Sequence, residues 1–406
     1  MVYKRFSLKE IELITLISVV VLSGCATVKM PNIGQSGYSL AADEKRLYKR
    51  ADEVVEQIDD SDLVYENQEL ENYLNQIANQ LLPVEIKNNE VAVVVKVIKD
   101  PTLNAFALPN GRIYIHTGML AVMDNEAQLA ALLGHEMTHT LHRHALKQFR
   151  SLTNKSAFFA TLQAPLVFAG GNLAGLLGQI TFVSSVFGYS KDLELEADGG
   201  GFTMMRDNRY DVKESTKLFE RLDQFIKDED IKEPFFFSTH PNVVARIKSF
   251  EGLIRKSEVS DQAVSEIKEE PFRQLTRQLV LDNFQFCLQK GMFKTADRHI
   301  SRFLEKYPDS PEGYWGRGEL FRQRQDSPEK RKKKREKAQD YTEAIKAFDQ
   351  AILLNPRLAS AYQGRGLVLQ KQGDIPGAKE AFQRYLELNP QASDKEYIEN
   401  FLVGNY

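Results

Sequence analysis

The segment His135-Glu136-Met137-Thr138-His139 carries two imidazoles and a carboxylate at a spacing suited to metal chemistry. It lies in an apolar run with helical periodicity, and residues four apart share one face of a helix. His135 and His139 can therefore bind a single zinc ion, while Glu136 sits beside it as the base for a water molecule. A pair of ordinary surface histidines is the alternative that this motif alone leaves open.

A catalytic zinc ion needs three protein ligands and one open position, so a further ligand must come from elsewhere in the chain. The acidic stretch from Ser190 to Asp198 favours a helix, and within it Glu194 and Asp198 lie one turn apart on the same face. This geometry suits Glu194 as the third ligand and Asp198 as a carboxylate that orients one imidazole. An exposed acidic helix face is the alternative.

With these motifs the chain resembles the zinc metallopeptidase family that includes the HtpX-like, CAAX-prenyl-protease-like and BepA-like enzymes. The elements that carry the resemblance occur in family order: Asn104 to Ala107, Gly111 to Tyr114, His135 to His139, Glu194 to Asp198, and His240-Pro241 before Arg246. The resemblance implies a zinc endopeptidase with one zinc ion per chain. It makes His135, His139 and Glu194 the metal ligands, Glu136 the catalytic base, and Asp198 the carboxylate behind them.

The same resemblance places His240 near the metal, in one of two roles. It either stabilises the oxyanion or occupies the open zinc position and restrains the enzyme; a structural cap formed from Ser238 to His240 is the alternative. Arg246 is interpreted as a salt-bridge anchor. His142 and His144 lack the spacing to join the zinc-binding face, so they are interpreted as groups at the helix end or behind the ligands.

The N-terminus predicts a lipoprotein signal peptide over residues 1–24. Basic residues precede an apolar run from Ile11 to Leu22, and Ser23-Gly24 lead into Cys25. Cys25 is then the lipidated first residue, followed by a tether over residues 25–42. Ala26 after the cysteine favours an outer-membrane lipoprotein that faces the periplasm of a Gram-negative bacterium. An uncleaved anchor is the alternative.

Composition and length limit the remaining possibilities. A length of 406 residues predicts two domains, and a hydrophobic content of 42% is enough for proper cores. The net charge of −3 argues against a general nucleic-acid binder. With Cys25 acylated, Cys287 is the only thiol left, so no intrachain disulfide is expected.

Two further segments bear on substrate access. No charged residue occurs from Ser156 to Ser190, which predicts a buried helix pair or lid over the site, with shallow membrane insertion as the alternative. The strand-like run from Arg112 to His116 is a candidate for pairing with an extended substrate, and an ordinary internal strand is the alternative.

The C-terminal part carries three copies of a pattern that resembles the tetratricopeptide repeat, a helix–turn–helix of about 34 residues. Its positions include Phe284, Gly318, Phe348, Gly366 and Phe382. Cys287 is expected to be a buried core thiol. The basic run from Arg331 to Arg335 lies in an extra segment, as a solvated loop or as a contact for acidic lipid or an acidic partner.

Together these observations predict a mainly α protein. A zincin-like α+β metallopeptidase domain with a small sheet (residues 43–255) is followed by a connector (256–275) and an α-helical tetratricopeptide repeat array (276–395). The expected function is degradation of misfolded or stalled periplasmic and outer-membrane proteins, with the repeats binding clients or the outer-membrane assembly machinery. The alternative is a chaperone-like assembly factor with dormant or secondary proteolysis.

Overall fold

The computed structural model describes residues 30–86, 92–151, 189–229, 240, 243–257, 265–326 and 334–404. The predicted signal peptide with Cys25, residues 152–188 of the uncharged segment and residues 331–333 of the basic run lie outside the described residues. None of the helices described is long and apolar enough to cross a membrane.

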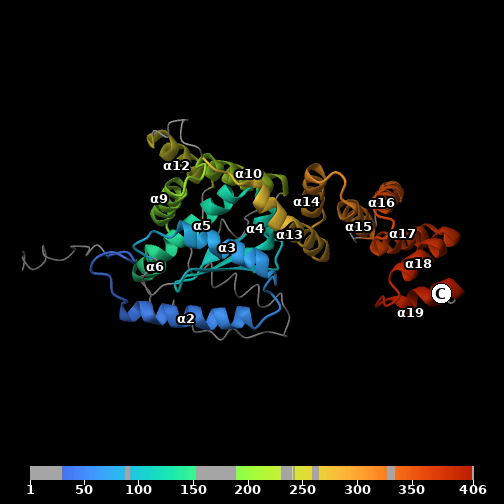
Figure 1. Ribbon diagram of the computed structural model, residues 1–406, viewed down its shortest axis with the longest axis horizontal. Helices are drawn as coiled ribbons and strands as arrows, with labels where there is room; N and C mark the ends of the chain where they lie inside the picture. The colour runs from blue at the N-terminus through green and yellow to red at the C-terminus, as the bar shows by residue number, and fades with distance from the viewer. Residues whose placement is uncertain are drawn as a thin grey trace, which may run out of the picture.

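The N-terminal elements form one rounded body (Figure 1). They are α2 (Ala42–Asp59), α3 (Gln68–Leu81), β1 (Val94–Ile98), β2 (Ala105–Ala107), β3 (Arg112–His116), α4 (Thr117–Val122), α5 (Glu126–Leu141), α6 (His144–Ser151), α9 (Lys191–Asp207), α10 (Lys213–Glu229) and α12 (Val243–Lys256). The C-terminal helices extend from one side of this body. They are α13 (Glu269–Gln289), α14 (Phe293–Lys306), α15 (Pro311–Asp326), α16 (Lys334–Leu354), α17 (Ala359–Gln372), α18 (Ile375–Leu388) and α19 (Lys395–Val403).

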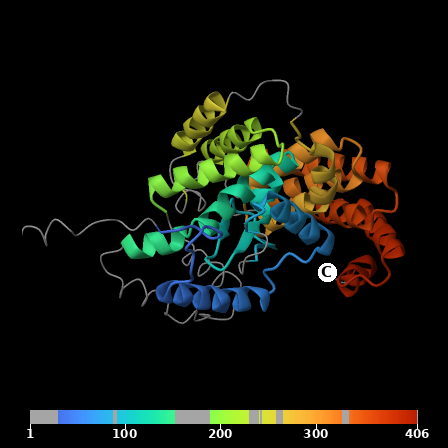
Figure 2. The ribbon, with the colours of Figure 1, turned by 60° about the vertical axis from the view of Figure 1, so that its left-hand side comes forward.

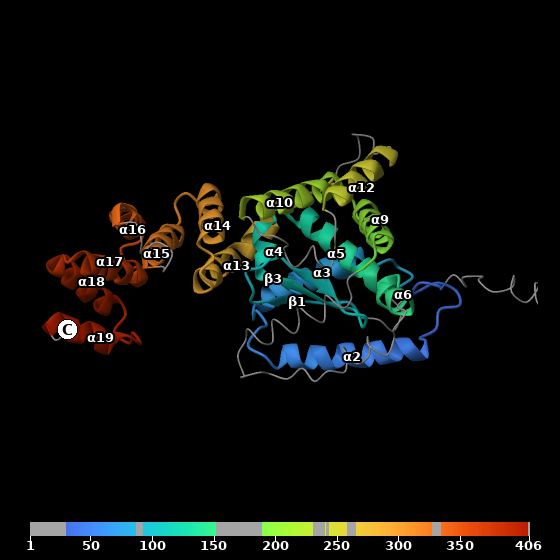
Figure 3. The same ribbon diagram turned by 180° about the vertical axis from the view of Figure 1, so that it is seen from behind.

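The small sheet lies between two helical layers. Its strand order is β1-β3-β2, with β1 parallel and β2 antiparallel to β3. Alternate residues of a strand point to opposite faces. On β3, Ile113 and Ile115 join the core on the α3 and α5 side, whereas Tyr114 packs on the α2 side. Figure 3 shows α2 beneath the sheet.

Because β3 is the central strand, its backbone groups already pair on both sides. The hypothesis that Arg112–His116 binds an extended substrate is therefore wrong, and the internal-strand alternative is correct. The spacing of apolar residues cannot tell a central strand from an edge strand, because that depends on which segments pair with it.

Helices α5 and α9 cross at very short range through glycine. A Cβ atom on Gly134 would lie 2.9 Å from the Gly201 Cα, and one on Gly201 would lie 2.9 Å from the His135 backbone nitrogen. A Cβ atom on Gly200 would meet the Thr138 side chain at 2.3 Å. The absence of side chains at these positions lets the two backbones touch, which brings the HExxH face of α5 onto the acidic face of α9.

The C-terminal helices form antiparallel pairs, and the fold class predicted from the sequence is confirmed. Helices α13 with α14, α15 with α16 and α17 with α18 pack as successive pairs, and α19 packs on α18. Figure 2 shows these helices following one another in an arc beside the rounded body. Cys287 is fully buried in the first pair, as expected.

Helix α13 belongs to both parts of the molecule. Its Phe272 and Leu279 lie in the main hydrophobic core of the N-terminal body, whereas Phe284 and Leu288 lie in the core of the array. Two polar contacts reinforce the joint: Tyr65 donates a hydrogen bond to Asp282 (2.6 Å), and Lys290 pairs with Asp100 (2.7 Å). The array is thus packed onto the body rather than attached by a free linker.

Candidate metal centre

Two capped helices position the groups predicted from the sequence. Asn125 caps α5, its side chain accepting a hydrogen bond from the Gln128 backbone N–H (3.0 Å), and every residue of α5 is buried. Ser190 is the N-cap of α9, so Glu194 falls in the first turn of that helix. His240 comes from the segment just before α12 and reaches the same point. Its predicted capping partner Ser238, like Pro241, lies outside the described residues.

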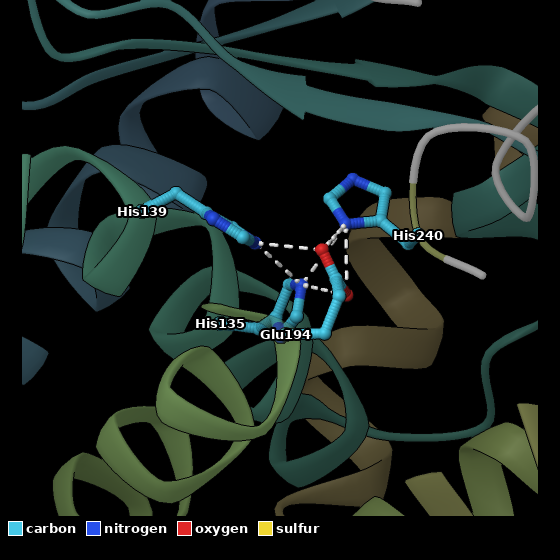
Figure 4. Close-up of side chains that lie close together, drawn as sticks. All are labelled: His135, His139, Glu194 and His240. Carbon is cyan, nitrogen blue, oxygen red and sulfur yellow. Dashed lines mark hydrogen bonds and ion pairs between the residues drawn. The ribbon is translucent and has the colours of Figure 1, made fainter. Parts of the chain in front are cut away.

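Four buried donor groups converge between these helices: His135, His139, Glu194 and His240, with one donor atom from each lying within 4.8 Å of the others. Figure 4 shows the three imidazoles and the carboxylate pointing at one another. His135 Nε2 lies 3.0 Å from His139 Nε2 and 3.2 Å from His240 Nδ1. Glu194 Oε1 lies 3.0 Å from His240 Nδ1 and 3.5 Å from His139 Nε2.

These separations fit a tetrahedral metal ion. Zinc bound to nitrogen or carboxylate oxygen at its usual bond length places neighbouring ligand atoms roughly 3.3 Å apart. The distances just given scatter around that value, and a set of three imidazoles and one carboxylate is one that zinc accepts readily. The donor chemistry and the spacing therefore both suit a bound divalent metal.

The electrostatics of the cluster keep two imidazoles neutral. Burial, together with neighbouring positive charge, holds the pKa of His135 and of His139 well below the usual value, so both rings offer a free lone pair. Burial alone would lower the pKa of His240, but the carboxylates of Glu194 and Glu136 raise it overall. Burial alone would likewise raise the pKa of Glu194, yet the charge of His240 lowers it. Without metal, His240 and Glu194 thus form a buried ion pair.

Glu136 lies beside the cluster but not in it. Its Oε1 atom is 3.6 Å from His240 Nε2, and its side chain is buried. Burial raises the pKa of Glu136, which makes its carboxylate a stronger base than one in water. The HExxH motif thus places two imidazoles in the donor cluster and one buried carboxylate next to it.

Asp198 and Arg246 support His135 from behind. His135 Nδ1 lies 3.0 Å from Asp198 Oδ1, the arrangement expected of a carboxylate that orients a metal-binding imidazole. Arg246 donates to that same oxygen at 2.6 Å and is itself buried. The prediction of Arg246 as an ion-pair anchor agrees with this contact.

His139 has two further neighbours, Tyr189, which the sequence did not single out, and His144. Tyr189 stacks on the His139 ring with 3.9 Å between ring centroids and 13° between planes. His144 Nδ1 lies 2.9 Å from His139 Nδ1, so of the two interpretations of His144 the structure favours the group behind the ligands. His142 is the C-cap residue of α5. The sequence does not single out Tyr189, because an isolated aromatic residue before a helix is as consistent with an ordinary hydrophobic core as with a functional site.

Comparisons with known proteins match two separate parts of the chain. Residues 65–254 match the model of peptidase family M48, and residues 336–402 match a tetratricopeptide repeat. The chain is 33% identical over 167 residues to the mitochondrial metalloendopeptidase OMA1 of Schizosaccharomyces pombe, covering 40% of this chain and 47% of that protein. It is 25% identical over 221 residues to the putative beta-barrel assembly-enhancing protease of Vibrio cholerae, covering 53% of this chain and 45% of that protein.

The fold and the site thus define a metallopeptidase-type domain that carries a helical repeat array. The chain carries a peptidase family M48 domain over residues 65–254 and continues into tetratricopeptide repeats, which confirms the resemblance predicted from the sequence. The chain spans less than half the length of these two curated relatives.

Proposed function

We propose that this protein is a zinc-dependent endopeptidase with one zinc ion per chain, held by His135, His139 and Glu194. The observation that carries the proposal is the convergence of buried donor groups at tetrahedral spacing, with the unligated carboxylate of Glu136 beside them. Hydrolysis of a peptide bond needs both a metal position and a base within reach of it.

The proposed mechanism assigns one task to each group. Zinc, when bound, polarises the scissile carbonyl and makes water nucleophilic near neutral pH. Glu136 takes the proton from the attacking water and later delivers it to the leaving amine, a double role that its raised pKa suits. Asp198 holds His135 in the tautomer that presents Nε2 to the metal position.

We assign His240 to the fourth position around the metal in the resting protein. Its Nδ1 atom lies among the donor atoms rather than beyond them, at 3.0 Å from Glu194 Oε1, which supports a restraining ligand over an oxyanion donor. While His240 held that position, it would keep water out of it. The His240→Ala variant should raise peptidase activity while retaining zinc. A fall of roughly 10²–10³ with zinc retained would instead assign His240 to the oxyanion.

The proposed substrates are misfolded or stalled proteins of the bacterial envelope, reached from an outer-membrane lipid anchor on Cys25. The printed name of the Vibrio cholerae relative, a putative beta-barrel assembly-enhancing protease, supports this setting. The repeat array would bind clients or the assembly machinery. His240 at the fourth position also favours the second candidate, a chaperone-like assembly factor whose proteolysis is dormant until His240 moves.

The decisive experiment incubates the purified mature chain with an unfolded protein, with and without a chelator, beside a Glu136→Gln variant. Cleavage should stop in chelator and return when zinc is added back. Glu136→Gln should retain zinc by elemental analysis but lose about 10²–10⁴ in rate, because only the base is removed. Turnover of this variant close to that of the wild type would refute the role of Glu136.

A further inference from the structure

The two imidazoles of the HExxH motif have different supports. His135 meets a carboxylate directly, through Asp198. On the far side of His139 lies another imidazole, since His139 Nδ1 is 2.9 Å from His144 Nδ1. His144 is fully buried, and its other nitrogen, Nε2, lies 3.4 Å from Glu196 Oε2. The carboxylate on this side, Glu196, therefore reaches His139 only through the His144 ring.

We propose that His144 and Glu196 are positioning residues that fix the orientation and tautomer of His139. The inference rests on His139 being a metal ligand, as in the proposed function. We call the three residues His139, His144 and Glu196 the imidazole chain.

The proton positions along the imidazole chain follow from its geometry. His139 Nε2 faces the donor cluster, so with metal bound its proton is on Nδ1. That proton is donated to His144 Nδ1, which must then be the acceptor. His144 is left with its proton on Nε2, which lies 3.4 Å from Glu196 Oε2. One carboxylate thereby determines the tautomers of two successive imidazoles.

The local backbone is built to hold this arrangement. Arg143 adopts a left-handed conformation (φ 59°) between α5 and α6, which ends α5 and turns His144 back against His139. The Arg143 side chain is buried and bonds to Glu44 (2.9 Å) and to the Pro31 carbonyl oxygen (2.9 Å). A non-glycine residue held in this conformation by its side-chain contacts is consistent with a required orientation of its neighbour.

Glu196 is fixed from the solvent side as well. His142 Nδ1 lies 2.6 Å from Glu196 Oε1, and Lys147 donates to the same oxygen at 3.1 Å. His142, His144 and Glu196 are close enough to be considered as a second metal site. The Lys147 ammonium in the same group opposes a divalent cation there, so the contacts are better explained as hydrogen bonds and an ion pair to one carboxylate.

The test measures zinc affinity rather than activity, by competition with a chromophoric chelator on the metal-free full-length chain. His144→Phe should weaken zinc binding by about 10–100-fold, the usual cost of losing a partner behind a metal ligand. His144→Asn should recover part of this loss, because its amide oxygen can accept from His139. Glu196→Gln should give a smaller loss. His142→Asn is the matched control, since it touches Glu196 but not His139, and should change zinc affinity less than Glu196→Gln does.

A double-variant cycle tests whether Glu196 and His144 act in series in the imidazole chain or affect packing independently. Because Glu196 acts only through His144, the His144→Phe/Glu196→Gln variant should bind zinc as His144→Phe does. The visible spectrum of the cobalt-substituted protein should change in His144→Phe and not in His142→Asn. Additive losses, or wild-type zinc affinity in a folded His144→Phe variant, would overturn the proposal.

Two further outcomes have distinct meanings. If His139→Ala leaves zinc affinity unchanged, the proposed metal site itself is wrong. If His139→Ala loses zinc while His144→Phe does not, only the positioning role fails. A second zinc ion per wild-type chain that is lost in Glu196→Gln would also overturn the proposal, because His144 and Glu196 would then be ligands.

Discussion

The metal centre and the repeat array both depend on close helix packing at glycine, but the glycines accommodate different groups in the two regions. At the metal centre, Gly134 and Gly201 let two backbones touch. In the array, Gly318 and Gly364 instead make room for one ring, since a Cβ atom on either would lie 2.4–2.5 Å from Phe348.

The two regions also differ in the sequence distance over which contacts form. His135 and His240 are 105 residues apart, whereas Arg365 and Asp349, which pair in the array, are 16 apart. The array is therefore built from neighbouring helices, while the metal centre assembles only when distant segments have docked. A substitution in the array should therefore affect only the neighbouring helices, whereas one at the metal centre should affect several distant segments.

The largest expected effect is on the stability of the array. Phe348→Ala should destabilise it by about 3–5 kcal/mol, because a fully buried aromatic ring is removed from between glycines. The single tryptophan, Trp315, packs against the Phe348 cluster, so its fluorescence in denaturant reports this unfolding. Leu353→Ala on the same helix is the control, because Leu353 is 73% exposed. Loss of zinc binding in Phe348→Ala would break the comparison.

A smaller effect is expected at the helix crossing beneath the metal. Gly201→Ala should lower the free energy of unfolding of the N-terminal body by about 1–3 kcal/mol, because the new methyl group forces α9 away from the backbone of α5. The same displacement should weaken zinc binding. Gly199→Ala is the matched control on the same helix, since a Cβ atom there meets nothing within 4 Å. Zinc competition should detect the Gly201→Ala change, whereas the unfolding curve followed by Trp315 fluorescence should stay the same. Phe348→Ala should give the reverse result. Equal zinc affinity in both glycine variants would contradict this account of the crossing.

The last expected effect lies at the joint between the two regions and appears only as the pH changes. Burial lowers the pKa of His299 on α14 to about 3, against an unfolded value of about 6.5. Between these values only the unfolded chain gains the proton. The contribution of His299 to stability therefore falls as the pH drops, by about 1.4 kcal/mol per pH unit.

His299→Gln should reduce the pH dependence of the free energy of unfolding below pH 6.5 by the amount that one titrating group contributes, about 1.4 kcal/mol per pH unit. Denaturant unfolding at several pH values between 6.5 and 4 would measure it. His116 in the N-terminal body, whose pKa burial lowers to about 4, is unchanged in this variant and should keep its own slope. An unaltered slope in His299→Gln would mean that the folded protein already carries this proton.

The features that repeat at short range could be predicted from the sequence alone. The four-residue spacing of His135 and His139, like that of Glu194 and Asp198, is a property of one helix and is visible without a fold. The repeat pattern is similarly local, since each copy packs on the next. The family resemblance then supplied the neighbourhood of His240, which no local spacing contains.

Only the tertiary structure decided which long-range partners meet. It placed His240 Nδ1 among the donor atoms, put β3 at the centre of its sheet, and brought His144 to the back of His139. The physical reason is that each of these outcomes depends on how helices and strands dock. Docking is set by close contacts such as Gly134 on Gly201, whose partners are 67 residues apart in the sequence and leave no periodic trace in it.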